Sequence, residues 1–259
     1  MEILFKTASG EVPAQAADAQ EALLFIEREY QEGDYIEISA EPGAHLFVQM
    51  DAAMMPGEVY LPTGVMTWRI PFGELRDAYS PAAFTGPRHI VSARVMTADE
   101  IAAPRVISCN PSDLRGDTDF FPHCTANVET RGESVFAARN VIDGVRFNHC
   151  HGRWPFESWG IGARTDAWCK LDFGRPVKTG EMLLTLRADF PHDAYWTQGH
   201  VVLSDGSEFA FPLEKTDKRQ RILFGGEHEI TWLRLERMVK SDDPSAFPSL
   251  TQWEVIGRG

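Results

Sequence analysis

The sequence predicts an all-β protein built from two sandwiches. Short runs in which apolar and polar residues alternate recur along the chain, and glycine and proline separate them. From residue 106 onward, no helical pattern interrupts these runs. A chain of 259 residues can bury one large core or two ordinary ones. We expect two domains, residues 1–105 and 106–259, joined near Pro104.

The first domain is predicted to be a small β-sandwich with one short helix. Asp18 and Glu21 have the spacing of a capping box. The apolar residues after them have roughly helical spacing and are Leu23, Leu24, Ile26 and Tyr30. Strand-like runs follow at residues 35–38, 45–50, 58–61, 65–70 and 89–95. No chemical motif is visible in this segment.

The second domain is predicted to be a jelly roll. Its eight strand candidates are residues 134–137, 167–173, 181–188, 200–204, 208–213, 220–224, 230–236 and 251–256. Asp205 and Gly206 form a hairpin turn signal between two of them. Eight short strands without intervening helices is the strand number of a jelly roll.

Sequence motifs at both ends of this segment support the same fold. They are Asn110-Pro111, the A-x-N-x-I-D-G pattern of residues 138–144, a tryptophan and D-F-G strand at 167–174, W-L-R-L at 232–235, and a closing strand at 252–257. Together they resemble the galactose-binding-like superfamily, which includes discoidin domains and family 32 carbohydrate-binding modules. The loop at 145–154 departs from the family pattern, because it is longer and basic. The resemblance implies an eight-stranded galactose-binding-like sandwich that displays a ligand on its loops.

Two loops of the second domain combine aromatic and polar residues suited to a sugar. A pyranose needs a flat apolar face, which tryptophan supplies, and hydrogen-bonding groups such as arginine and histidine. The candidate ligand-binding residues are His151, Arg153, Trp154, Trp159, Arg187, Asp189, His192, Tyr195 and Trp196. In sugar-binding relatives an arginine near the position of Arg187 often contacts the sugar. The alternatives are that the tryptophans close the end of the barrel, and that Arg187 forms an internal ion pair.

Resemblance to relatives that bind a structural calcium points to Asp143 and Glu254 as ligands, with Asn148 as an added oxygen. Ca²⁺ needs six to eight oxygens, so these side chains do not complete a site. The alternative role for Asp143 is to cap the turn before Gly144. We expect no required cofactor, with structural Ca²⁺ as the one candidate.

The predicted function is non-catalytic binding of a carbohydrate or another polyol-like ligand. No nucleophile elbow, phosphate-binding loop or dinucleotide-binding motif is present. The first alternative is a glycoside-processing enzyme that uses Asp189, His192 and Glu157. The second is a protein-protein interaction or assembly module, which would include a homodimer.

Charge and cysteine content limit the partners and the compartment. The chain carries 25 basic and 38 acidic residues, a net charge of −13, which disfavours nucleic acid and anionic membranes as partners. The N-terminus lacks the pattern of a secretory signal, which indicates a cytoplasmic protein, with an extracellular location as the alternative. In a cytoplasm the four cysteines, which contain no CxxC pair, are expected to be reduced.

Overall fold

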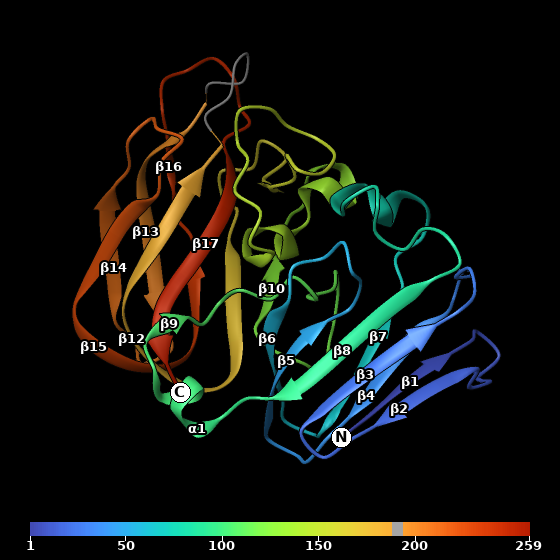
Figure 1. Ribbon diagram of the computed structural model, residues 1–259. Coiled ribbons are helices and arrows are strands. Elements are labelled where there is room, and N and C mark those ends of the chain that lie inside the picture. Colours follow the sequence, from blue (N-terminus) through green and yellow to red (C-terminus); the bar gives the residue numbers. More distant parts are fainter. Residues whose placement is uncertain (188–193) are drawn as a thin grey trace.

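The computed structural model describes residues 1–187 and 194–259 and contains two β-sandwiches side by side (Figure 1). The N-terminal domain consists of two four-stranded antiparallel sheets. The first sheet has the order β2 (Ala14–Ala17), β1 (Glu2–Lys6), β4 (Tyr35–Ser39) and β7 (Val65–Arg69). The second has the order β3 (Glu21–Ile26), β8 (His89–Val95), β5 (Ala44–Gln49) and β6 (Gly57–Leu61). Alternate residues of the strands point inward and form one apolar core between the sheets.

The prediction of a short helix after Asp18 is wrong, because residues 21–26 form strand β3. Asp18 Oδ1 accepts hydrogen bonds from the backbone N–H groups of Gln20, at 2.8 Å, and Glu21, at 3.0 Å. The cap-like geometry therefore exists, but it closes a turn. In β3, Leu24 is buried and Phe25 is exposed, which is the alternation of a strand. The helical elements of this domain lie elsewhere, as the 3₁₀ helix η1 (Gly73–Ala78) and the helix α1 (Ala98–Ala102).

The C-terminal domain is built on one nine-stranded sheet that folds into a sandwich. Its main path has the order β11 (Trp159–Gly160), β17 (Ser249–Arg258), β12 (Cys169–Leu186), β15 (Gln220–Leu235), β13 (Trp196–Leu203) and β14 (Glu208–Pro212). The short strands β9 (Arg105–Val106), β10 (His123–Ala126) and β16 (Val239–Lys240) pair with β17, β12 and β13. All of these pairings are antiparallel. None of the helices in the described ranges has the length and apolar character that a membrane-spanning helix needs.

Two long strands account for four of the predicted short ones. The predicted runs 167–173 and 181–188 both fall largely in β12, and the runs 220–224 and 230–236 fall in β15. The β12–β15 register shifts between Asp172 and Val177 and again between Thr179 and Glu181. Such irregularities bend a strand, so one strand contributes to both layers of a sandwich. The predicted strand 134–137 is wrong, because the 3₁₀ helix η3 (Ser134–Phe136) is found there, between η2 (Thr130–Gly132) and η4 (Ala138–Ile142).

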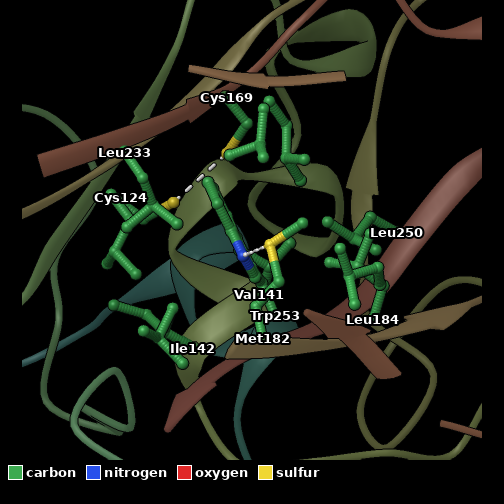
Figure 2. Close-up of a cluster of buried hydrophobic side chains, with 14 of the residues drawn as sticks. Cys124, Val141, Ile142, Cys169, Met182, Leu184, Leu233, Leu250 and Trp253 are labelled. Carbon is green, nitrogen blue, oxygen red and sulfur yellow. Dashed lines mark hydrogen bonds between the residues drawn. The ribbon is translucent and has the colours of Figure 1, made fainter. Parts of the chain in front are cut away.

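The core of the C-terminal domain surrounds Trp253, which is fully buried on β17 (Figure 2). Its indole Nε1 donates to Met182 Sδ at 3.2 Å. Beside it the buried sulfur atoms of Cys124 and Cys169 face each other across β10 and β12 at 3.2 Å, as two thiols rather than a disulfide. Burial raises the pKa of the Cys124 thiol well above its ordinary value.

The two domains are joined by a buried polar network around Glu58 of β6. Arg105 Nε donates to Glu58 Oε2 at 2.8 Å, and Arg175 of β12 donates to Glu58 Oε1 at 2.9 Å. Burial alone raises the pKa of Glu58, but hydrogen bonds from His45 and Arg105 and the charge of Arg175 lower it to about 2. A main-chain bridge between Tyr60 and residue 121 adds a second connection. The chain therefore has two cores and a charged junction near the predicted boundary at residue 105.

Candidate functional site

A pocket of about 450 Å³ lies between the two domains. The N-terminal domain supplies the loop at residues 53–55 and the segment at 78–80. The C-terminal domain supplies η4 and the loop after it. The C-terminal lining residues are Pro111, Arg139, Asp143, Gly144, Val145, Arg146, Phe147, Trp154 and Glu157. This volume is in the range of small-molecule sites.

Gln252 of strand β17 holds the turn at Asp143 and Gly144, which line this pocket, by hydrogen bonds. Gln252 Nε2 donates to Asp143 Oδ1 and to the carbonyl of Asn140, both at 2.7 Å. Gln252 Oε1 accepts from the N–H of Gly144 at 3.1 Å. Gly144 has φ +85°, and an added Cβ would lie 2.6 Å from Met55 Cε of the other domain. The A-x-N-x-I-D-G motif thus needs its glycine both for the turn and for the close approach of the N-terminal domain.

Two neighbouring carboxyl groups are buried in the pocket. Asp143 is 4% exposed and Glu157 is 2% exposed. Asp143 Oδ1 accepts from Gln252 and from the N–H of Val145, so Asp143 does cap its turn. Within the described ranges, no other residue donates a hydrogen bond to Asp143 Oδ2 or to the carboxyl oxygens of Glu157. These buried oxygens therefore have only each other as hydrogen-bond partners, through a proton that the pair shares.

The carboxyl pair holds a proton at neutral pH. Burial, and next the negative charge of Asp143, raise the pKa of Glu157 to about 9. Burial also raises the pKa of Asp143, although the charge of Arg139 opposes it. A protonated Glu157 that donates to an ionised Asp143 accounts for both directions, because two adjacent carboxylates cannot easily ionise together.

Arg139 supplies a fixed positive charge beside this pair. It is 4% exposed, and its guanidinium donates to the carbonyls of Asp113, at 2.6 Å, and Pro111, at 3.0 Å. The guanidinium also lies over the ring of Tyr79 at 4.6 Å from the centroid. Nη1 of the same guanidinium donates to Asn140 Oδ1 at 3.1 Å, so each of its three nitrogens is held by one hydrogen bond and Arg139 supplies one fixed positive charge to the two carboxyl groups.

The rim of the pocket is apolar and partly exposed. Trp154 is 37% exposed, Phe147 is 56% exposed and Met55 is 46% exposed. The N–H of Trp154 donates to the carbonyl of Asp77 of the N-terminal domain at 2.8 Å, which fixes the loop against η1. An aromatic face with buried acceptors beneath it is the combination that a sugar or another cyclic polyol requires.

The structure separates the residues that the sequence grouped into one ligand site. Trp159 and Trp196 are buried core residues that stack on each other at 6.3 Å, so they close the sandwich, as the alternative interpretation held. Tyr195 packs against the same core. Arg153 is exposed and pairs with Asp77 at 3.1 Å.

Two of the other predicted ligand-binding residues, His151 and Arg187, lie at the same cavity. His151 and the buried Arg187 line a second cavity of about 150 Å³, together with Phe247. Asp189 and His192 lie outside the described residues. Of the predicted ligand-binding residues that the structure describes, Trp154 alone lines the larger pocket.

The three predicted calcium ligands do not fit a calcium cage. Glu254 is engaged by Arg219, at 2.8 Å, and by Arg146, at 3.4 Å. Asn148 directs its amide nitrogen, not its oxygen, at two backbone carbonyls. Asp143 is turned toward Gln252. Within residues 1–187 and 194–259, no group of three or more His, Cys, Asp or Glu side chains is arranged to hold a metal ion.

Comparisons with known proteins find similarity in structure. No family model and no curated protein matches the sequence. The lectin domain of lectinolysin in complex with Lewis B antigen has a TM-score of 0.44 at 17% identity, over 60% of this chain and 97% of that one. A Streptococcus pneumoniae fucose binding module has 0.43 at 14%, over 59% and 95%. The family 32 module of C. perfringens NanJ, in complex with galactose, has 0.39 at 15%, over 51% and 91%. Structures similar to this chain thus include the family 32 modules that the motifs resemble.

Proposed function

We propose that this protein binds a carbohydrate or a related polyol-like ligand in the interdomain pocket, without chemical turnover. One observation supports this above the rest: the same pocket is lined by Trp154, which is 37% exposed, and by the buried carboxyl groups of Asp143 and Glu157. A ring stacked on the indole would bring its hydroxyl groups to these acceptors. The printed names of the similar structures, which include galactose and fucose binders, agree with this class of ligand.

Binding measurements on two matched aromatic variants test the location. Trp154→Ala removes the aromatic face of the interdomain pocket, and Phe247→Ala removes a partly exposed aromatic from the smaller cavity near Arg187. A glycan array identifies a ligand, and titration calorimetry then measures both variants. We expect Trp154→Ala to weaken binding about tenfold or more, the order of 1–3 kcal/mol for one stacking contact. An effect of Phe247→Ala alone would place the ligand at the predicted loop end instead.

A catalytic function is the second candidate, and the same carboxyl pair favours it. A protonated Glu157 beside an ionised Asp143 has the form of an acid and a base. Glycosidases, however, hold their two carboxyl groups roughly 5–9.5 Å apart, on either side of the bond to be cleaved. Here Glu157 and Asp143 interact with each other through a hydrogen bond. Turnover of a glycoside or ester panel that disappears in both Glu157→Gln and Asp143→Asn would replace the binding proposal with an enzyme.

A further inference from the structure

Two of the four cysteines, Cys124 and Cys169, meet in the core of the C-terminal domain. The antiparallel register of β10 and β12 places Cys124 opposite Leu171 and Ala126 opposite Cys169. Since Leu171 is two residues from Cys169, both cysteines point to the same face of the sheet. Their sulfur atoms are 3.2 Å apart (Figure 2). Sulfur atoms in a disulfide are about 2.05 Å apart, so an approach of about 1.2 Å separates this pair from a bond.

The other two cysteines contact other groups. Cys109 Sγ would lie 3.3 Å from a Cβ added at Gly144, so it sits against the turn at the interdomain pocket. Cys150 is exposed, and its sulfur lies 3.9 Å from the carbonyl oxygen of His151. The structure therefore favours a single disulfide, with two cysteines left as thiols.

The segment between Cys124 and Cys169 contains little regular structure to hold it. Residues 127–168 contain one strand, β11, of two residues, and the 3₁₀ helices η2, η3 and η4. Apart from Pro111, the C-terminal residues that line the interdomain pocket all belong to this segment. A bond between its two ends would lower the entropy of the unfolded chain, and this effect grows with the length of the closed loop. The bond would thus stabilise the folded state of the segment that lines the pocket.

We propose that Cys124 and Cys169 form a disulfide when the chain folds in the presence of a small disulfide such as oxidised glutathione. The thiolate of one cysteine attacks a glutathione sulfur, breaks the glutathione disulfide and expels one glutathione thiolate. The thiolate of the other cysteine then attacks the protein sulfur of this mixed disulfide and expels the second glutathione. The two cysteines lose two electrons, the glutathione disulfide gains them, and the two thiol protons pass to the departing glutathione thiolates. This inference does not depend on the ligand of the pocket.

Burial then preserves whichever state folding has produced. Cys124 is 3% exposed and Cys169 is 0% exposed. Burial, and next the hydrogen bond with Cys169, raise the pKa of the Cys124 thiol well above its ordinary value. The folded, reduced protein therefore offers little thiolate to an oxidant. The same burial keeps an external thiol from the sulfur atoms of the disulfide, so the bond lasts until the protein unfolds.

Refolding of the full chain under two redox conditions tests the inference. Protein unfolded in urea with a reductant is refolded either with dithiothreitol or with a mixture of reduced and oxidised glutathione. Peptide mapping after alkylation should find Cys124 linked to Cys169 in the second product and four free thiols in the first. The melting temperature of the linked protein, measured without reductant, should be higher by about 5 °C or more. Cys150→Ser should keep the link and the rise, whereas Cys169→Ala should lose both.

Each contrary result bears on one step of the inference. Cys124 and Cys169 found as free thiols after refolding with oxidised glutathione, or linked to Cys109 or Cys150 instead, would overturn the disulfide. The expected link with an unchanged melting temperature would refute its stabilising role. Rapid reduction of the link by dithiothreitol in the native protein would contradict the protection by burial. Peptide mapping uses the wild-type protein, so it decides the matter even if Cys169→Ala fails to fold.

Discussion

Replacing Glu157 by glutamine should flatten the pH dependence of the protein's stability. The pKa of Glu157 is raised to about 9 in the folded protein, whereas an unfolded chain ionises glutamate near its ordinary value of about 4.3. Between these values the folded state holds one proton more than the unfolded state. The free energy of unfolding must then fall as the pH rises, by about 1.4 kcal/mol per pH unit for one proton. From pH 5 to pH 8 this amounts to roughly 4 kcal/mol.

Urea denaturation at pH 5, 6, 7 and 8 measures this effect. Glutamine cannot ionise, so Glu157→Gln should match the wild type near pH 5 and exceed its stability at pH 8 by roughly 4 kcal/mol. Glu32→Gln should follow the wild-type curve, because Glu32 is exposed. Parallel curves for the wild type and Glu157→Gln would refute the reasoning, since they would mean that Glu157 ionises normally in the folded protein.

Three further outcomes follow from burial and pairing. Trp159→Ala should lower the free energy of unfolding by about 3–5 kcal/mol, because the indole is fully buried; a loss below 1 kcal/mol in urea denaturation would contradict that placement. Cys150 is exposed, so a thiol reagent should modify it quickly in the native protein, whereas the buried Cys124 and Cys169 should react only on unfolding. Rapid modification of three or four cysteines would argue against the burial of Cys124 and Cys169. Calcium and chelator should both leave the melting temperature unchanged, because Glu254 is already paired with two arginines; a rise of several degrees with calcium would restore the metal site.

The fold was predictable where a strand has one buried face and a clear end. The runs 65–70 and 89–95 met both conditions and are β7 and β8. Asp18 misled because a side chain that accepts two backbone N–H groups looks the same in a helix cap and in a turn before a strand. A helix and a strand differ here in whether every second residue after Asp18 is buried. That alternation arises because these residues pair with strand β8.

The site was predictable only in its parts. Asp143 and Glu157 were each singled out, one as a calcium ligand or turn cap and the other as a candidate acid. Their pairing depends on how the irregular loop between η4 and β11 folds back on itself. No periodic pattern of the sequence encodes the path of such a loop. The buried tryptophans failed as ligand residues for a related reason, since composition does not tell which side of a loop the core occupies.

Glu58 joins Arg105 and Arg175 at the junction of the domains, and its low pKa keeps that junction charged down to strongly acid conditions. Rotation of one sandwich against the other would separate the buried Glu58 from the buried Arg175, which makes a hinge motion costly. The walls of the pocket are consequently held in register before any ligand arrives. A gene fragment that encoded either sandwich alone would carry only part of the pocket lining, so the pair is the smallest unit that recombination could transfer with the pocket complete.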